Sequence, residues 1–599
     1  SNQAASHLQS LPWELLHDGK TGFSQGAKPA RIRRRLPNYE QKLPSITELP
    51  IRILLITARP EQEGVRYIDH RASALPLVDA VESLGDLLQL TVLTPATSQA
   101  LEHALSQAQD NEKPYHVLHF DGHGVYDPQF GLGALCFEDP NDSDKLTERR
   151  MDLVYADKLA ELLHDYRIPL VFLEACQTAQ SDTSPNASVA AKLLEQGISS
   201  VVAMTHSVLV ETARRFVTQF YTAMAQGQTV GNAMLAGQKE LKENTFRLPI
   251  IGAGELHLQD WFVPILYQEQ YDPQLFKQIP SAIAQTMLAQ QNQSILGELP
   301  LTPEHTFIGR SHELLQIERL LEQQPYAVIR GQGGVGKTTL AVELARWLVR
   351  SQRFDRCAFV SVEQYSHERA VLDTLGKQLV NDHYSIAEYG NDLDKALQPI
   401  LRTLENDRTL LLLDNMESLL ADSDNQQPVL ALFQQLLAKA NKSTRLIFTS
   451  RESLTAPFHH QAREIKLAEL SVSDAKALVM QVMNNQGLNL RDDDQGKSPK
   501  EVEDLVNAVG CHARALVLLA KELAEQGITA TTDSIKQIMQ DLHQKYPEQR
   551  EKSLFASVEL SLQRLSPQER EILQGLAVFY GGGNLVSIAD VLDIESKIA

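Results

Sequence analysis

The chain has 599 residues, which is too long for a single hydrophobic core, so at least three domains are expected. Its 43% hydrophobic and 22% charged residues are ordinary for a soluble globular protein. A net charge of -20 argues against a general nucleic-acid or membrane-surface binder. The basic run RIRRR at 31–35 is the exception, and such runs are typical of solvated loops.

Cysteine use and hydropathy bear on the cellular compartment. None of the cysteines has metal-ligand spacing or looks paired, which favours a reducing, cytoplasmic environment. No apolar run reaches about 18 residues, so we expect no membrane span. The sequence stops at ESKIA within what reads as an unfinished domain, and we expect further C-terminal sequence.

Residues 50–267 alternate between strand-like and helix-like segments. Continuous apolar strands between amphipathic helices predict an α/β fold with a mostly parallel sheet covered on both faces. Helix-like segments fall at 72–84, 156–166, 186–196 and 210–225. Strand-like runs fall at 52–58, 115–120, 134–139, 168–175 and 199–205. Chemistry in such sheets gathers beyond the carboxyl ends of the strands.

Two of these strands lead into reactive residues. HFDGHG (119–124) carries His123, and LEACQTA (173–179) carries Cys176, which is 53 residues later (176 minus 123). A caspase has a similar spacing between its histidine and its cysteine. An imidazole helps to form the nucleophilic thiolate and later protonates the leaving amine. We expect the glycines to let the backbone turn sharply and expose His123, with backbone N–H groups near Gly124 and Cys176 stabilising an oxyanion.

The structural alternative stays open at this point, because a lone cysteine at a strand end is usually a core residue. We interpret Cys136 and Cys357 in that way, and His119, inside its strand, as structural. Spacing alone does not decide between a catalytic and a structural role for His123 with Cys176.

Five segments resemble the CHAT domain, a family in the caspase–separase–gingipain clan of cysteine peptidases. They are LPWELLHDGKTGF near the start, HFDGHG, PLVFLEACQTA, SSVVAMTHSV and WFVPILY at 261–267. The resemblance covers about residues 8–268 and implies His123 as the base and Cys176 as the nucleophile. Relatives in this clan often select a charged side chain in the substrate. Asp121, Asp139 and Glu174 are all candidates to bind a basic one.

A second signature begins at a strand, YAVIR (326–330), and continues as GQGGVGKT, which matches GxxxxGK[ST] in full. The glycines let backbone N–H groups wrap phosphates, Lys337 reaches the β- and γ-phosphates, and Thr338 binds Mg²⁺. The following helix directs its N-terminus at the anion. The predicted nucleotide-binding residues here are Gly331, Gly333, Gly334, Val335, Gly336, Lys337, Thr338 and Thr339.

Further segments agree with a nucleotide site. TLLLLDN (409–415) is a buried strand ending in Asp414, the acidic position associated with Mg²⁺ in such NTPases. RLIFTSR (445–451) ends in Arg451, which is suited to sensing a γ-phosphate. FIGR (307–310) lies just before a helix.

This arrangement resembles the NB-ARC type of STAND NTPase over about residues 301–599. The resemblance implies that Ile308, Gly309 and Arg310 lie against the nucleotide base. GCHARALVLLA (510–520) resembles the family's GxPLAL segment without its proline, which puts a contact there in doubt. NB-ARC proteins commonly carry a second acid after the first. Here that position is Asn415, and Glu417 is the next residue able to position water, so we expect slow hydrolysis. A solvated helix-start residue is the structural alternative for Glu417.

The predicted layout is a CHAT domain (1–268), a connector (269–300), a P-loop domain (301–460), a helical domain (461–550) and the start of a winged-helix domain (551–599). The combination predicts a cysteine peptidase switched by ATP and ADP with Mg²⁺. Its expected partners are a protein substrate, further copies of itself, and a trigger sensed by sequence beyond residue 599. The resemblance suggests bacterial defence against phage or regulated cell death. The alternative is a catalytically inactive adaptor on the same switched scaffold.

Overall fold

The computed structural model describes residues 11–16, 30–35, 44–62, 67–69, 71, 74–127, 129–177, 185–204, 209–250, 254–269, 271–278, 296–301, 307–362, 367–420, 424–440, 443–485, 500–519, 522–523, 525, 527–545, 552–562 and 570. These residues form two compact units, one mainly before and one mainly after residue 294. Within the described part of the chain, no helix combines the length and the apolar character needed to cross a membrane.

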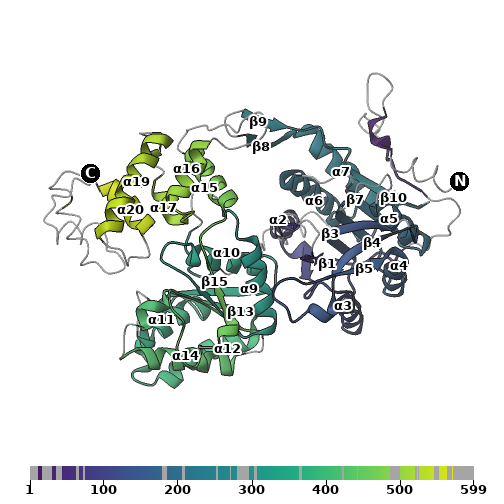
Figure 1. Ribbon diagram of the computed structural model, residues 1–599. Coiled ribbons are helices and arrows are strands. Elements are labelled where there is room, and N and C mark those ends of the chain that lie inside the picture. The colour runs from purple at the N-terminus through teal and green to yellow at the C-terminus, as the bar shows by residue number, and fades with distance from the viewer. Residues whose placement is uncertain are drawn as a thin grey trace, which may run out of the picture. The chain divides into compact units, whose positions relative to one another are not determined.

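The N-terminal unit is built on an eight-stranded, mainly parallel sheet (Figure 1). The strand order along its main path is β10-β7-β6-β3-β1-β2, in which only β10 is antiparallel to its neighbour. On a side path, β4 pairs antiparallel with β3, and β5 with β4. The strands are β1 (Ile51–Thr57), β2 (Leu88–Val92), β3 (Val117–Asp127), β4 (Leu132–Glu138), β5 (Met151–Tyr155), β6 (Leu170–Gln177), β7 (Ser200–Met204) and β10 (Pro264–Gln268).

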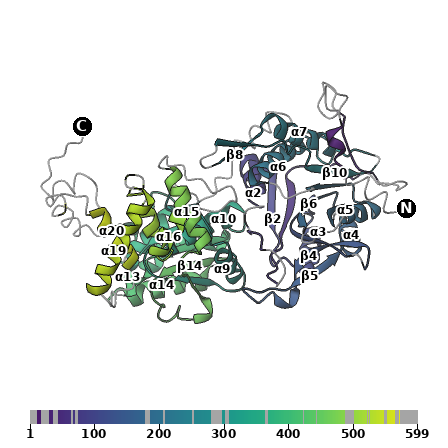
Figure 2. The same ribbon diagram turned by 45° about the horizontal axis from the view of Figure 1, so that its top comes forward.

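Helices cover both faces of this sheet (Figure 2). On one face lie α2 (Leu75–Leu84), α6 (Val210–Ala225) and α7 (Val230–Glu243), and on the other lie α3 (Ser98–Asp110), α4 (Ala156–Asp165) and α5 (Pro185–Glu195). Phe172 of β6 packs against Phe216 and Phe220 of α6, with ring centroids 6.2 and 6.1 Å apart. Leu118 and Leu173 point the other way, into the core with α3, α4 and α5. The predicted α/β class is confirmed.

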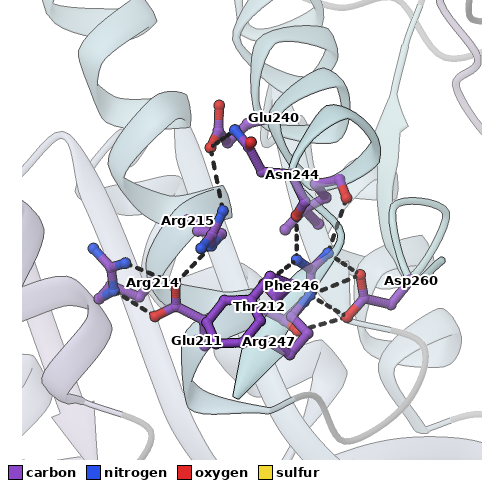
Figure 3. Close-up of polar contacts among 10 residues, drawn as sticks. Glu211, Thr212, Arg214, Arg215, Glu240, Asn244, Phe246, Arg247 and Asp260 are labelled. Carbon is purple, nitrogen blue, oxygen red and sulfur yellow. Dashed lines mark hydrogen bonds and ion pairs between the residues drawn. The ribbon is translucent and has the colours of Figure 1, made fainter. Parts of the chain in front are cut away.

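A buried arginine fastens α6, α7 and the hairpin strand β8 (Phe246–Ile250) together (Figure 3). The Arg247 guanidinium donates to both carboxylate oxygens of Asp260 and to the carbonyls of Leu241, Asn244 and Phe246. Thr212 of α6 donates to the same Asp260 at 2.5 Å. The hairpin is completed by β9 (Gly254–His257).

The basic run near the N-terminus is partly structural rather than a solvated loop. Arg34 is buried, donates to both carboxylate oxygens of Glu14 at 2.7 and 3.1 Å, and forms a β-bridge with Tyr267. Arg31 pairs with Asp272 at 2.5 Å. The interpretation of the run as a solvated loop is therefore wrong for Arg34, whose charge is neutralised inside the N-terminal unit.

Part of the predicted connector packs as regular structure. Phe276 is fully buried and forms a bridge with Thr47, while Gln274 forms one with Thr229. Residues 271–278 therefore pack with the N-terminal unit. Residues 279–295 lie outside the described part of the chain.

The C-terminal unit has a five-stranded parallel sheet in the order β12-β13-β14-β11-β15. The strands are β11 (Tyr326–Arg330), β12 (Arg356–Ser361), β13 (Thr409–Asp414), β14 (Arg445–Ser450) and β15 (Glu464–Lys466). Helices α11 (Glu368–Leu379), α12 (Leu393–Asn406) and α14 (Gln426–Lys439) pack on one face, and α9 (Ser311–Gln323) and α10 (Lys337–Arg350) lie on the other (Figure 1). The short helix α13 (Met416–Leu420) follows β13.

A helical bundle with its own apolar core follows the sheet. It comprises α15 (Val472–Asn485), α16 (Lys500–Ala508), α17 (Ala513–Leu518), α19 (Ile528–Lys545) and α20 (Lys552–Leu562). Short 3₁₀ helices occur at Trp13–Leu15, Gly85–Leu87, Pro140–Asp142, Ile386–Tyr389 and Gln461–Arg463. Of the predicted winged-helix start, residues 563–569 and 571–599 lie outside the described residues.

Candidate functional site

The first candidate site lies where strand β3 changes neighbours. Along Val117–Asp121, β3 pairs with β1, and from His123 onward that edge pairs with β4 instead. On its other edge, β3 pairs with β6 from Val117 to Gly124. His123 is thus opposite Cys136 on β4 and opposite Cys176 on β6. The register brings the two predicted catalytic residues to adjacent backbone positions beyond the carboxyl end of β1.

The motif that carries His123 is part of a continuous strand and not a turn. β3 runs without interruption from Val117 to Asp127, and His123 is only 4% exposed. The predicted sharp turn and exposed imidazole are therefore wrong. Gly122 serves close packing instead, because a Cβ there would lie 3.0 Å from the Phe120 ring and 3.3 Å from the Ala58 carbonyl oxygen. Likewise, β6 includes Cys176 and ends one residue later.

A buried polar row lies on the same face of β3 as His123, since side chains two residues apart share a face. Asp121 forms an ion pair with Arg59 at 2.5 Å, with both side chains almost fully buried. His119 stacks on Phe172 and contacts Glu174 through Nε2 at 3.3 Å. Burial raises the pKa of Glu174, and the hydrogen bond from His119 opposes this rise.

Each of the three acids proposed to bind a basic substrate side chain already has a partner within the protein. Asp121 is held by Arg59, Glu174 by His119, and Asp139 by Arg150 at 3.1 Å. Asp139 also caps a 3₁₀ turn by accepting from the Asn141 N–H. Each acid has a structural role in this conformation, and a basic substrate would have to compete with that partner.

The side chains of Cys136 and Cys357 are both buried. Cys136 is fully buried, and burial raises the pKa of its thiol to about 12, so it stays protonated at neutral pH. Cys357 is buried in the other unit, and its pKa is raised for the same reason. Both fit the predicted core role. The side chain of Cys176 lies outside the described part. Gly124 lies in the ladder opposite Leu135 and Gln177.

The second candidate site is the loop between β11 and α10. Gly334 and Gly336 have positive φ values of 76° and 101°, which favour glycine, and they wrap the loop around the start of α10. The Lys337 ammonium donates to the carbonyls of Gly331 and Gln332, both at 3.0 Å. This strand–loop–helix arrangement is the one the sequence predicts for a phosphate-binding loop.

The carboxylate at the end of β13 is joined directly to this loop. The Thr338 hydroxyl donates to Asp414 at 2.7 Å, and Thr449 of β14 donates to the same oxygen at 2.5 Å. Burial raises the pKa of Asp414, while both hydroxyl bonds lower it. Asn415 follows in the left-handed region at φ 62°, which asparagine tolerates, and its N–H bonds to Thr449. A hydroxyl beside a carboxylate suits Mg²⁺ bound together with phosphates.

A cavity of about 1110 Å³ opens beside the loop. The predicted residues that line it are Ile308, Arg310, Gly333, Gly334, Val335, Gly336, Lys337, Thr338, Thr339, Glu417 and Arg451. Gly309, Gly331 and Asp414 are not among the lining residues. Val517, Leu518, Phe555 and Val558 of the helical bundle complete an apolar side, so the cavity joins a phosphate-binding end to an apolar end.

The segment before α9 is held against the loop. Gly309, at φ 69°, approaches Asp474 so closely that a Cβ would lie 2.4 Å from its carboxyl carbon. Arg310 is buried and donates to the carbonyls of Val335 at 3.3 Å and Ala468 at 2.6 Å. Ile308 and Arg310 therefore reach the cavity, and the arginine also braces the loop.

Sequence reasoning missed two residues at this site. Thr449 precedes the predicted Arg451 by two positions, and nothing in an apolar strand distinguishes its hydroxyl. His512 lies in the segment where the absent proline put a contact in doubt. In the structure, its Nε2 is 2.9 Å from the Gly333 carbonyl oxygen. The sequence marks this position only by a polar residue where the motif has a proline, which does not indicate the contact with Gly333.

Two protein families match separate parts of the chain. Residues 3–272 match the CHAT domain family, and residues 313–489 match the NB-ARC domain family. The chain combines a CHAT domain with an NB-ARC domain. This pairing supports a STAND-type signalling protein in which a peptidase-like domain accompanies an ATPase module.

Two curated relatives cover parts of the chain. An uncharacterized WD repeat-containing protein of Nostoc is 30% identical over 159 residues, which are 24% of this chain and 13% of the relative. A probable disease resistance protein of Arabidopsis thaliana is 27% identical over 225 residues, which are 37% of this chain and 24% of the relative. The chain thus spans less than a quarter of either relative's length in these alignments.

Among the solved structures that the chain matches is a STAND protein with a tetratricopeptide repeat sensor from Pyrococcus horikoshii. It is 16% identical, has a TM-score of 0.30, and the match covers 50% of this chain and 38% of that one. A Walker-type ATPase of Pyrococcus abyssi is 14% identical with a TM-score of 0.31, covering 50% of this chain and 88% of that one.

Proposed function

We propose that the protein is a cysteine endopeptidase whose CHAT domain is controlled by nucleotide bound to its NB-ARC domain. The observation that carries the peptidase half is the register of β3 and β6, which pairs His123 with Cys176. In this proposal, His123 takes the thiol proton, the Cys176 thiolate attacks the peptide carbonyl, and the imidazolium returns the proton to the leaving amine. Backbone N–H groups near Gly124 and Cys176 stabilise the oxyanion.

The polar row behind His123 supports this role. Arg59, just after β1, pairs with Asp121, which is two residues before the proposed base. Glu174, on β6, bonds to His119, which is four residues before it. An ordered strand with buried partners restrains the imidazole, and restraint of a base favours productive geometry. Cys136, the other cysteine opposite His123, is an unsuitable nucleophile because burial raises the pKa of its thiol to about 12.

The nucleotide half rests on the bond between Thr338 and Asp414 at the mouth of the phosphate loop. These two residues would hold Mg²⁺, which when bound neutralises charge on the β- and γ-phosphates. Lys337 would contact those phosphates, while Ile308 and Arg310 would lie toward the base. Glu417 would position water, and Arg451 would sense the γ-phosphate.

We infer that the NB-ARC domain acts as a switch and not as a motor. ADP would hold a closed state, and ATP with a trigger would favour an open, oligomeric state in which the peptidase is active. Such a shift requires that nucleotide and trigger bind the two states with different affinities. The disease-resistance name of the Arabidopsis relative supports a role in defence or regulated cell death.

One observation favours a second candidate, a catalytically inactive adaptor. His123 is only 4% exposed and lies inside a paired strand, so a substrate cannot reach it freely in this conformation. An adaptor would keep the fold and the switch and would need no open histidine. A resting peptidase would need a rearrangement at the rim of the site.

The two cysteines opposite His123 provide a matched test of the nucleophile. A thiol-reactive peptide probe should label the parent and Cys136→Ala, and should fail to label Cys176→Ala and His123→Ala. Mass spectrometry of the labelled peptide identifies the site. No labelling of any variant under activating conditions supports the adaptor, whereas labelling of Cys136 moves the nucleophile to β4.

The switch is tested by measuring molecular mass and proteolysis side by side with ATP and the trigger. Lys337→Ala should block assembly and cleavage together, while Cys176→Ala should block cleavage alone. Full peptidase activity from a nucleotide-free Lys337→Ala monomer would show that the two domains work independently.

A further inference from the structure

His512, at the start of α17, packs against the phosphate loop. It is only 4% exposed and forms the N-cap of α17, where its Nδ1 accepts from the Ala515 N–H at 3.3 Å. A neutral imidazole has one acceptor and one donor nitrogen. Since Nδ1 accepts, Nε2 carries the hydrogen and donates to the Gly333 carbonyl at 2.9 Å.

His512 is one of several groups that together occupy every carbonyl of the loop. Three chain segments supply them: the start of α10, the residue before α9, and the start of α17. The side chains of Lys337, His512 and Arg310 donate hydrogen bonds to four of these carbonyls: Lys337 to Gly331 and Gln332, His512 to Gly333, and Arg310 to Val335. Backbone N–H groups bond to the other two: Arg514 to the Gly334 carbonyl and Leu340 to the Gly336 carbonyl. These contacts together fix the orientation of the loop's peptide units.

The geometry of the peptide bond links those carbonyls to phosphate binding. In a trans peptide unit, the C=O and the following N–H point in opposite directions. A carbonyl of Gly333 aimed at His512 therefore turns the N–H of Gly334 away from His512. In the same way, the Arg514 N–H at 3.1 Å from the Gly334 carbonyl turns the N–H of Val335 away from α17. Backbone N–H groups turned inward are the groups with which such a loop holds phosphates.

The start of α17 approaches the backbone of Gly334 very closely. Gly334 has a φ of 76°, and a Cβ at this position would lie 2.7 Å from the His512 ring and 3.0 Å from the Arg514 Cβ. The start of α17 thus packs directly on the loop backbone, which leaves no room for a side chain at Gly334. A proline at position 512, as in the motif that this segment resembles, would have no N–H to offer Gly333.

We propose that His512 is a positioning residue for nucleotide phosphates: it fixes the peptide unit between Gly333 and Gly334 and so makes phosphate affinity depend on the docking of α17. This inference rests on the proposed nucleotide site. By linkage, bound phosphates favour the docked α17, and an undocked α17 weakens phosphate binding by the same factor. His512 thereby connects the helical bundle to the loop without touching the nucleotide.

The test measures ADP, pyrophosphate and adenosine binding to the chain by calorimetry. His512→Ala should weaken ADP and pyrophosphate by about tenfold each, the effect of one buried hydrogen bond, and leave adenosine unchanged. His512→Gln keeps a side-chain N–H donor and should recover most of the affinity. A general loss of structure would weaken adenosine as well, so the split between phosphate and base separates positioning from unfolding.

His367 provides the matched control, because it is also a histidine N-cap, accepting from the Ala370 N–H at 3.3 Å at the start of α11. His367→Ala should leave all three affinities unchanged. Equal ADP and pyrophosphate affinity in the parent and His512→Ala overturns the inference while the nucleotide site stands. A parent that binds no ADP, with Lys337→Ala no different, overturns the nucleotide site and this inference together.

Discussion

Arg451 and Glu417 form an ion pair in the lining of the cavity beside the phosphate loop. The Arg451 Nε–H donates to one carboxylate oxygen of Glu417 at 3.0 Å, and its backbone N–H donates to the other at 3.2 Å. Both residues line the cavity. The pair holds the Glu417 carboxylate beside the cavity, where it is placed to position water in the proposed hydrolysis.

We therefore predict that removal of the Glu417 charge separates hydrolysis from binding. Glu417→Gln should slow ATP hydrolysis by about 100-fold, the usual contribution of a positioned base, with ATP affinity nearly unchanged. Phosphate release and nucleotide affinity, measured on the same sample, check this. An unchanged hydrolysis rate would return Glu417 to the structural role of a helix-start residue.

A second prediction concerns the buried carboxylate of Asp414. Its folded-state pKa is raised by burial, so the folded protein favours the protonated form. The stability associated with that proton is present at low pH and is lost as pH rises through the raised pKa. Asp414→Asn removes this cost. The nucleotide-free variant should unfold at a higher temperature than the parent at neutral pH, and the difference should shrink as the pH is lowered.

The same variant should lose the extra stability that Mg²⁺ adds to ATP-bound protein, because the amide cannot replace the carboxylate. Thermal unfolding with ATP, with and without Mg²⁺, checks this. If Mg²⁺ stabilises Asp414→Asn as much as the parent, the metal is held elsewhere.

A third prediction concerns the ion pair two residues before His123. Arg59→Ala leaves the Asp121 carboxylate buried without its cation, and should destabilise the N-terminal unit by about 3–5 kcal/mol. Urea unfolding measures this effect. Arg150→Ala is the control, since its side chain is 57% exposed and screened by water, and it should change stability much less. Equal effects would mean that burial of the Arg59 pair does not decide its strength.

A fourth prediction separates backbone strain from contact at the phosphate loop. Gly390 has a φ of 57° with nothing near its missing Cβ, so Gly390→Ala should cost about 1 kcal/mol of stability and leave ADP affinity intact. Gly334→Ala adds a collision with His512 to the same kind of strain. It should destabilise more and weaken ADP binding. Equal ADP affinity in the two variants would show that the loop tolerates displacement of α17.

Much of this fold could be predicted from local pattern. The helix at 210–225 and the strand at 326–330 have the predicted bounds, because their apolar patterns are strong. The phosphate loop was predictable because its glycines serve a local backbone geometry. These features depend on residues close together in the sequence.

What depended on distant partners could not be predicted. The HFDGHG motif predicts a turn because glycine is common in turns, yet pairing with both β4 and β6 keeps it in an extended strand. Arg34 reads as solvated within a basic run, yet Glu14 neutralises it. The contact of His512 with Gly333 joins positions 179 residues apart, and no local pattern reports it.

Along one edge of β3, the neighbouring strand changes from β1 to β4, so the surroundings of His123 depend partly on strands outside the parallel core. The pairing of β3 with β1 ends at Asp121, and β4, which continues into β5, pairs with β3 from His123 onward. Changes in loop length or side chains within the β4–β5 hairpin can therefore alter the surroundings of His123 while β1, β3, β6 and β7 keep their register. For the proposed peptidase, chimeras that exchange the β4–β5 hairpin between relatives should therefore inherit the cleavage preference of the donor.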